Sequence, residues 1–427
     1  MTHPSKMHQI LDPDPDQTIA VAFSRFWAAG LVVLVATSWK LWFSLDGSDY
    51  PSIPLLPVGK TFLDGLQSFG FISSITVVTC SVYLLFFPRN DSPWILVGIG
   101  LLLCFVSDQH RIQPWAYQSF FYSFIFGVLP ARKWHFWILP FAASIYAYSA
   151  AGKFDSQFFH TVGNDFVTVI ANTFDLDLGD SNSTIRNRLI ALLPSTELLV
   201  ALGLCFRRTR VQACLMAMVM HLTLFIMLGP WAKNHSVGVL IWNLMLVVQN
   251  FYLIRCFGFQ RLTSATEFVG SEIVESKTAQ HWCVLSLWMI ALISPCLERF
   301  GYWDHWTSWS LYSPHTSRAR IEFHQSIISR LSESQQKSLE PDIDGDQWQE
   351  LNLGVWSLGQ RGVPVYPQAR YQLEIAYQVA KNIGLDDEIR VKLQSVSDRK
   401  TGVRKEERYL NVKEIAEARE QFWLRPK

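Results

Sequence analysis

The sequence predicts an all-α polytopic membrane helix bundle of about nine spans, followed by a small α+β extracytoplasmic domain. Hydrophobic residues make up 49% of the chain and gather in blocks long enough for a helix to cross a bilayer. The 17 Trp and 29 Phe residues suit aromatic belts at the membrane interfaces. After about Thr316 the long apolar blocks end and charged residues become frequent. These observations together favour a membrane protein over a chain of soluble domains.

Residues 1–25 are polar and begin MTHPSKMHQILDPDPDQT. This stretch lacks the pattern of a cleavable signal, so we expect a cytoplasmic N-terminal segment. The net charge of +1 gives no general attraction to nucleic acid, and we expect no nucleic-acid partner. The seven cysteines show no CxxC spacing, which favours packing roles over a thiol redox centre.

Residues 26–300 contain the apolar blocks of the predicted bundle. The expected spans lie at about 26–44, 67–87, 93–107, 115–130, 134–151, 189–206, 211–229, 236–254 and 280–296. Backbone amides in lipid must be paired within their own segment, so each block is expected to be a helix. The partner that these blocks imply is the lipid bilayer.

Basic residues in the short loops predict the orientation. The loop FRRTR contains Arg207, Arg208 and Arg210, and placing it in the cytoplasm also places Arg132 and Lys133 there. The N-terminus is then cytoplasmic and the C-terminus extracytoplasmic. We expect a multi-pass protein of the bacterial inner (plasma) membrane.

This orientation brings three polar segments, 108–115, 150–160 and 229–236, to the outer side. Loops at one end of a bundle can converge on one cavity, and ionisable residues near membrane depth are candidates for function. Arginine and histidine can position an anionic or carbonyl group there, although an Asp–Arg pair can also simply cap helix ends. The expected substrate-binding residues are Asp108, Arg111, Gln113, Lys233, Asn234 and His235. The last three could instead form a solvated turn.

Lys153, His110 and His221 are the candidate catalytic residues. Lys153 closes the fifth span, where a partly desolvated lysine can act as a base, or can simply extend its charged end to the interface. His221 lies mid-span in MVMHLTLFIM, where an imidazole can take part in chemistry or form a hydrogen bond inside the bundle. The histidines form no HExxH motif and no tight cluster with acids, so the sequence predicts no metal site.

Residues 301–315 are rich in aromatic side chains. Trp303, Trp306, Trp309 and Tyr312 recur at helical spacing. Such spacing predicts an interfacial belt or an amphipathic helix at the membrane surface.

Residues 316–427 predict a soluble α+β domain. RARIEFHQ and EIRVKLQSV alternate as strands do, and DRKTG after the second favours a hairpin turn. PQARYQLEIAYQVAKNIG predicts a helix that ends at Gly384. Asn411 with Glu414 resembles a capping box for a last helix. DIDGD lacks the further residues of a calcium loop and is expected to be a turn.

Three segments carry a resemblance to a known family: DQHRIQPWAYQ, YSAAGKFDSQFF and MVMHLTLFIMLG. With the extracytoplasmic tail, they resemble the horizontally transferred transmembrane (HTTM) domain family over roughly residues 20–300. That family includes the vitamin K-dependent γ-glutamyl carboxylase. The YWDHWTSWSLYSP run and the tail are similar, more weakly, to DoxX/MauE-like membrane proteins.

The resemblance implies a carboxylase-like, quinone-linked membrane enzyme with an outward-facing site. Lys153 matches the family's lysine base by context, and His110 and His221 match its histidine positions. A lipid quinone or hydroquinone is the cofactor that the resemblance implies.

Two further classes of function stay open. A non-enzymatic scaffold, assembly factor or immunity-type protein would use residues 316–427 to bind an extracytoplasmic protein partner. A transporter would need inverted repeats and broken helices, and the sequence shows no such repeat.

Overall fold

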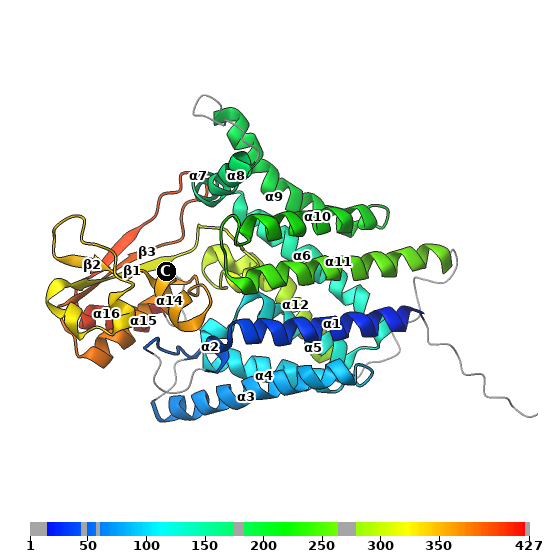
Figure 1. Ribbon diagram of the computed structural model, residues 1–427, viewed down its shortest axis with the longest axis horizontal. Coiled ribbons are helices and arrows are strands. Elements are labelled where there is room, and N and C mark those ends of the chain that lie inside the picture. The colour runs from blue at the N-terminus through cyan, green and yellow to red at the C-terminus, as the bar shows by residue number, and fades with distance from the viewer. Residues whose placement is uncertain (1–14, 44–48, 57–59, 174–182, 264–278, 423–427) are drawn as a thin grey trace, which may run out of the picture.

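The computed structural model describes residues 15–43, 49–56, 60–173, 183–263 and 279–422. The described chain is mostly helical, with a helix bundle beside a smaller part that contains a sheet (Figure 1). Each segment predicted to span corresponds to a helix. These helices are α1 (Pro15–Thr37), α3 (Lys60–Phe86), α4 (Pro93–Ser107), α5 (Pro114–Val128), α6 (Trp134–Lys153), α9 (Ser183–Cys205), α10 (Arg210–Leu228), α11 (Val237–Thr263) and α12 (Ala279–Ile293).

Among the described residues, five helices are long and apolar enough to cross a membrane, which favours a lipid bilayer as the environment. Their apolar stretches are Gln17–Thr37, Ser68–Phe86, Thr184–Cys205, Arg210–Leu228 and Val237–Phe257. By contrast, α4, α5 and α12 have 15 residues each. A helix of that length rises only about 22 Å, less than the roughly 30 Å of hydrocarbon. The structure therefore supports five candidate spans, fewer than the predicted nine.

The first helix begins earlier than the sequence predicted. It starts at Pro15, whereas a polar segment was expected through residue 25. Proline fits the first turn because its missing N–H would have no partner inside the helix. Further along, the α1 side chains Phe23 and Trp27 are buried, and Phe23 stacks on Tyr252 of α11 with ring centroids 4.3 Å apart. Packing on α11 therefore stabilises a helix within residues 15–25, a stretch whose polar composition did not predict one.

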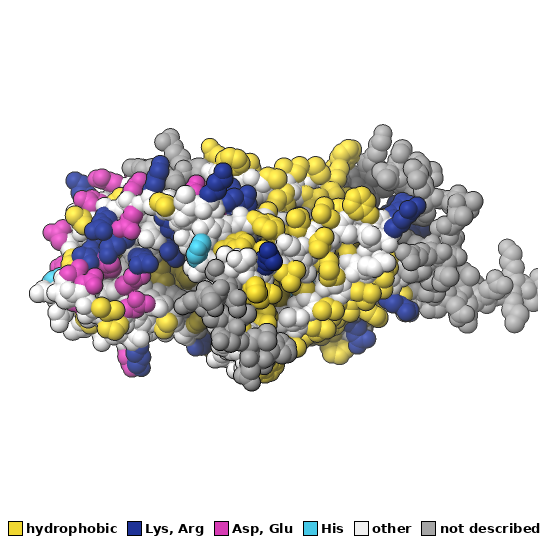
Figure 2. Space-filling model, turned by 90° about the horizontal axis from the view of Figure 1, so that it is seen from above, with side chains coloured by type: hydrophobic (Ala, Val, Ile, Leu, Met, Phe, Trp, Pro, Cys, Tyr) yellow, Lys and Arg dark blue, Asp and Glu magenta, His cyan; other side chains and the backbone are white. Residues whose placement is uncertain are grey.

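The outer surface of the bundle is apolar. Figure 2 shows hydrophobic side chains gathered over the bundle, while acidic and basic side chains crowd the end that contains the sheet. Phe69, Leu199, Val219 and Phe251 are among the large hydrophobic residues that are more than half exposed. A soluble monomer rarely exposes so much contiguous apolar surface, so this face suits contact with lipid.

The sheet has four antiparallel strands in the order β2-β1-β3-β4. They are β1 (Arg318–His324), β2 (Trp348–Glu350), β3 (Ile389–Gln394) and β4 (Glu406–Tyr409). The central strands β1 and β3 bury Ile321 and Val391 in register with each other. The alternating sequences RARIEFHQ and EIRVKLQSV thus form strands, as predicted, and the turn between β3 and β4 is the expected hairpin.

Helices pack around this sheet. They are α13 (Glu333–Gln336), α14 (Leu353–Arg361), α15 (Ala369–Ile383) and α16 (Val412–Phe422). Helix α15 buries Leu373, Ile375 and Val379 and ends where Gly384 takes the left-handed conformation (φ 72°), as the sequence predicted. At α16 the Asn411 side chain accepts a hydrogen bond from the Glu414 N–H, as expected of a cap.

The aromatic segment 301–315 does not form the amphipathic helix that was one of the two structures its spacing predicted. Only Trp306–Ser308 makes one short 3₁₀ turn, η5. Trp309 has a left-handed backbone (φ 59°) and is fully buried against Tyr117 and Phe141. The segment instead runs between the bundle and the sheet-containing part, where burial of its rings outweighs helical periodicity.

Three short helices lie at the same end of the bundle as the sheet. They are α2 (Trp39–Trp42), α7 (Ser156–His160) and α8 (Val162–Thr173). The Ser156 N–H donates to the Arg399 carbonyl (2.9 Å) and the Gln157 amide donates to the Gly402 carbonyl (2.7 Å). The segment after α6 is therefore held against the hairpin of the C-terminal part.

Candidate functional site

A cavity of about 550 Å³ lies where α6, α9, α10 and α11 meet the C-terminal part. Its polar lining includes Lys153, Glu197, His221 and Asn243, while residues 305–316 and 362–367 contribute to the opposite side. Apolar side chains from the bundle, including Trp115 and Trp242, complete the lining. Its size falls within the range usual for small-molecule sites, about 300–1,000 Å³.

A buried ion pair forms one wall of this cavity. The Lys153 ammonium donates to both carboxylate oxygens of Glu197, at 2.7 and 2.8 Å, and to the Ser149 hydroxyl at 2.6 Å. Lys153 is 5% exposed and Glu197 8% exposed. Ser149 lies one turn before Lys153 on α6, and Glu197 comes from the middle of α9. An amine and a carboxylate are thus held together beside a space that a small molecule could fill.

His221 belongs to a hydrogen-bonded network that joins three helices. Its Nε2 lies 2.9 Å from the Tyr146 hydroxyl and its Nδ1 lies 2.9 Å from Asn243 Oδ1. The Asn243 amide group donates to the Val239 carbonyl, so its oxygen must face the imidazole. His221 therefore carries its proton on Nδ1 and accepts at Nε2 from Tyr146, whose oxygen in turn accepts from Asn250 at 2.9 Å. The network fixes the orientation of the His221 ring.

A second histidine of the cavity wall, His305, is oriented by an acid. His305 Nδ1 lies 3.1 Å from Glu298 Oε1, and His315 Nε2 lies 2.8 Å from the same oxygen. Glu298 belongs to η4 (Ser294–Phe300), a 3₁₀ segment that continues α12. Burial acts to raise the pKa of Glu298, but the two imidazoles outweigh it and hold that pKa well below its usual range. Burial lowers the pKa of His315, so a carboxylate and a neutral imidazole are the favoured forms.

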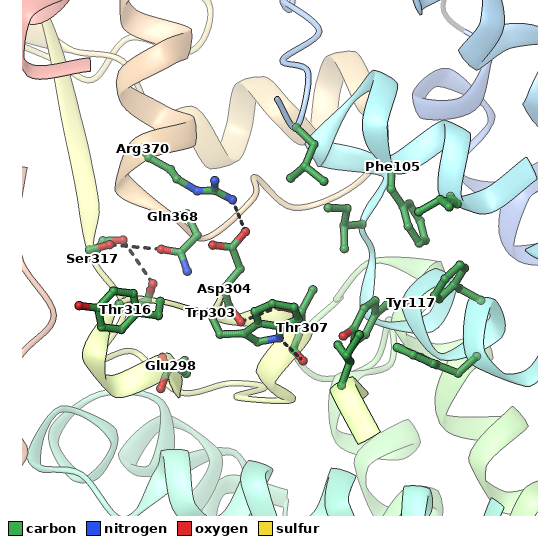
Figure 3. Close-up of a pocket in the computed structure, with 18 of the residues that line it drawn as sticks. Phe105, Tyr117, Glu298, Trp303, Asp304, Thr307, Thr316, Ser317, Gln368 and Arg370 are labelled. Atoms are coloured by element: carbon green, nitrogen blue, oxygen red, sulfur yellow. Dashed lines mark hydrogen bonds and ion pairs between the residues drawn. The ribbon is translucent and has the colours of Figure 1, made fainter. Parts of the chain in front are cut away.

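A second cavity, of about 480 Å³, lies on the other side of Glu298. Figure 3 shows its polar wall with Asp304, Gln368 and Arg370, and its apolar wall with Phe105 and Tyr117. Arg370 forms an ion pair with Asp304. Glu298 lines this cavity and His305 lines the first, so the carboxylate–imidazole contact lies between residues of the two linings, and Thr316 lines both cavities.

The structure brings four of the predicted site residues to the first cavity: Gln113, Lys153, His221 and His235. His235 follows the turn after α10, and burial lowers the pKa of its imidazole. Lys233 instead forms an ion pair with Asp165 of α8 at 2.5 Å. Asn234 occupies the left-handed region (φ 46°) and shapes the turn.

His110, Asp108 and Arg111 are not among the described residues that line this cavity. His110 is fully buried at the junction with the C-terminal part, where its Nε2 lies 2.8 Å from the Pro364 carbonyl oxygen. Burial lowers the pKa of His110 to about 4. Asp108 pairs with Arg361 of α14 at 3.4 Å.

Arg111 connects α2 with the end of α4. Its guanidinium donates to the carbonyls of Leu41 and Trp42 and to the Ser107 hydroxyl. The polar stretch 108–111 therefore joins the bundle to the C-terminal part and does not line the first cavity.

Several residues of the site escaped the sequence analysis. They are Tyr146, Glu197, Asn243, Asn250, Glu298, His305 and His315. One signal was available for Glu197, because an acid inside an apolar span is itself a functional candidate. His305 and His315 lay in a run whose aromatic residues suggested a different role.

No family model matches the chain, and no curated protein or solved structure matches it either.

Proposed function

We propose that this chain is a multi-pass membrane enzyme of the HTTM, carboxylase-like type, in which Lys153 acts as a base on a lipid hydroquinone. The observation that carries the proposal is the Lys153 amine, buried beside Glu197 on the wall of a cavity of about 550 Å³. A structural ion pair needs no adjoining space, whereas a catalytic base needs room for its substrate.

The pair offers a route to a free amine. A proton can pass from the Lys153 ammonium to the Glu197 carboxylate, across contacts of 2.7 and 2.8 Å. The amine can next accept the proton of a hydroquinone hydroxyl, and the Tyr146–His221 network offers further polar contacts for the ring oxygens.

The lining also suits an apolar substrate. Trp115, Ile145, Leu224, Trp242 and Leu246 line the cavity together with the polar groups. Apolar walls with a few placed polar groups are typical of small-molecule sites. A ring with an isoprenoid tail fits this description better than a charged metabolite does.

We further propose that the cavity faces away from the cytoplasm, in a bacterial inner membrane. Figure 2 shows Lys and Arg side chains at the end of the bundle opposite the sheet. Arg207 and Arg208 lie between α9 and α10 and Arg210 begins α10; the two helices turn at that end in Figure 1. Basic loops favour the cytoplasmic side, so the C-terminal part is proposed to be extracytoplasmic.

The proposal is tested with the full chain in lipid nanodiscs and vitamin K hydroquinone as the probe. Deprotonation speeds oxidation of a hydroquinone by dissolved oxygen, which yields quinone and hydrogen peroxide and is followed by quinone absorbance. We expect Lys153→Met to lower the rate above empty nanodiscs about 100-fold or more, the range of general-base contributions. Lys337→Ala is the matched control, because Lys337 is exposed and pairs with the exposed Glu333 at the surface. A wild-type rate no higher than that of empty nanodiscs, or a Lys153→Met rate equal to wild type, rejects the proposal.

A double variant separates chemistry from folding. Removing one partner of a buried ion pair costs about 3–5 kcal/mol, whereas replacing both with apolar residues is often neutral. Lys153→Met with Glu197→Met is therefore expected to recover stability while the hydroquinone rate stays low. Recovery of both would make the pair dispensable for catalysis.

The alternative proposal is a non-enzymatic protein that binds an extracytoplasmic partner through residues 316–427. One face of that part is engaged by the bundle, through Asp108–Arg361 and His110–Pro364. Its remaining surface carries mixed charges. Capture of one stoichiometric partner by the full chain, with no hydroquinone turnover, would favour this alternative.

A further inference from the structure

Glu298, His305 and His315 gather three metal-ligating atoms at one buried point. One ligand atom from each of the three residues lies within 4.8 Å of the other two, and Glu298 Oε1 lies 3.1 Å from His305 Nδ1 and 2.8 Å from His315 Nε2. The three residues are 7%, 3% and 0% exposed. They come from η4, from the residue before η5 and from the segment that leads into β1, so tertiary folding is needed to assemble them.

The donor set is one that transition-metal dications prefer. Two imidazoles with one carboxylate occur in catalytic zinc sites, where a fourth position stays open, and in non-haem iron sites. The observed distances from Glu298 Oε1, 3.1 Å to His305 and 2.8 Å to His315, are near the spacing between ligands of one ion. Zn–N and Zn–O bonds of about 2.0–2.2 Å place tetrahedral ligands about 3.4 Å apart. A shift of a few tenths of an ångström would separate these atoms enough to admit an ion.

Hydrogen bonding alone leaves this cluster incompletely satisfied. One carboxylate oxygen has to accept from both imidazoles, which fixes the proton of each ring on the nitrogen that faces Glu298. His315 Nδ1 is then a buried acceptor, and it has no hydrogen-bond partner in the described part of the chain. An ion would use the three lone pairs that face one another, and the His315 proton would then lie on Nδ1, where an ordered water would have to accept it.

The cluster is also reachable. Glu298 lines the cavity of about 480 Å³ that Figure 3 shows, where it lies beside Thr316 and across from Phe105. His305 lines the cavity that contains Lys153. The neighbouring Arg299 is paired with the buried Asp155 at 3.0 Å, so its charge is compensated. An ion here could therefore exchange with one cavity and keep an open position toward it.

We propose that Glu298, His305 and His315 bind a transition-metal dication, with Zn²⁺ as the reference ion. The open position would take water or the oxygen of an anionic or carbonyl-bearing small molecule that enters from the cavity of Figure 3. The site carries one carboxylate against two ionic charges, so a net positive charge remains to attract such an oxygen. This inference is independent of the role proposed for Lys153.

The test uses the full chain, purified through a tag without histidine, stripped with a chelator and placed in lipid nanodiscs. Co²⁺ is the probe, because its visible absorption reports both the amount bound and the coordination number; Zn²⁺ is then added in competition. We expect one Co²⁺ per chain with bands of a four- or five-coordinate nitrogen–oxygen site, displaced by Zn²⁺. Glu298→Gln and His315→Gln should each weaken binding at least about 100-fold. His324→Gln, a histidine at the end of β1 outside the cluster, is the matched control.

A wild-type chain that gives no such bands at saturating Co²⁺ overturns the proposal, whatever the variants do. Binding that survives both Glu298→Gln and His315→Gln also overturns it, because the ion would lie elsewhere. Each variant is first checked for a monodisperse elution profile, so loss of binding is read only from folded protein. Hydroquinone turnover does not enter this readout, so failure here and failure of the Lys153 proposal are separate results.

Discussion

Lys153 and His110 are both buried ionisable residues, but their surroundings differ. Lys153 lies 2.7 Å from the Glu197 carboxylate on a cavity wall. His110 has no such space: it lies between Tyr50 and Tyr371, with ring centroids 5.6 and 5.5 Å away, at the junction with the C-terminal part. Burial favours the neutral imidazole there, so His110 stabilises the fold only while it is uncharged.

His110 is therefore expected to make the junction sensitive to acid. Its folded pKa of about 4 lies below the ordinary value of 6.5, so the unfolded chain binds more protons between these two pH values. The stability contributed by neutral His110 is complete above about pH 6.5 and is lost as the pH falls toward 4. The loss approaches about 3 kcal/mol, at 1.36 kcal/mol for each pKa unit.

The measurement compares wild type with His110→Gln by the free energy of unfolding in mixed micelles at pH 7.5 and pH 4.5. Glutamine can still donate to the Pro364 carbonyl but does not titrate. Other buried imidazoles contribute equally to both proteins, so the difference isolates His110. The free energy of unfolding of wild type minus that of His110→Gln should fall between pH 7.5 and pH 4.5; an unchanged difference would contradict the prediction.

At the scale of elements, small residues let the helices of the bundle approach closely. A Cβ added at Gly100 of α4 would lie 2.8 Å from Val77 Cγ2 and 3.3 Å from the Ser73 carbonyl oxygen of α3. Close backbone approach is typical of helix pairs in membranes, where dispersion replaces the hydrophobic effect between helices. The contact of α3 with α4 therefore depends on the missing side chain at Gly100.

Gly100→Ala is expected to lower the free energy of unfolding by about 1–3 kcal/mol, the usual cost of overpacking. Gly238→Ala in α11 is the control, because its nearest atoms lie at 3.9 and 4.0 Å, an ordinary contact. That change should be neutral or slightly stabilising, since alanine favours helix over glycine by about 1 kcal/mol. The measurement is the melting temperature of each variant in the same detergent. Equal melting temperatures for the two variants would contradict the prediction.

Sequence periodicity predicted some secondary-structure elements correctly and others wrongly. Strand β1, strand β3, the end of α15 at Gly384 and the cap of α16 each depend on neighbours in sequence, and each was predicted. The helix expected from Trp303, Trp306 and Trp309 did not form, because Trp309 is buried between the bundle and the C-terminal part. The spacing of residues along the sequence shows which side chains could share one face of a helix. It does not show which other elements those side chains will pack against.

At the scale of the whole molecule, Arg361 connects the two parts of the chain. Its side chain is 1% exposed, it pairs with Asp108 and donates to the Tyr50 carbonyl and the Ser52 hydroxyl, both at 3.0 Å. The adjoining residues 362–367 contribute to the cavity that holds Lys153. Contact between the C-terminal part and the bundle therefore also completes the lining of the cavity.

Arg361→Ala is expected to leave Asp108 buried without its partner, at a cost of about 3–5 kcal/mol. Hydrogen exchange should rise in α14 and in residues 108–111 before it rises in the core of the bundle. Arg320→Ala is the control, because the Arg320–Glu350 pair is half exposed and 3.7 Å long, and such pairs contribute about 1 kcal/mol or less. Uniformly increased exchange over the whole chain would mean that Arg361 supports global stability and not the junction.

The sequence by itself determined the helical membrane character of the chain and most strands and caps of its C-terminal part. These features follow from composition and short-range periodicity, which need no knowledge of distant partners. It also placed Lys153 and His221 among the candidates, and the structure puts both on one cavity wall. Only the tertiary structure decided that Glu197 pairs with Lys153, that His110 lies at a junction, and that Glu298, His305 and His315 meet. Those contacts join residues from separate elements, and their geometry is set by how the helices pack around each other.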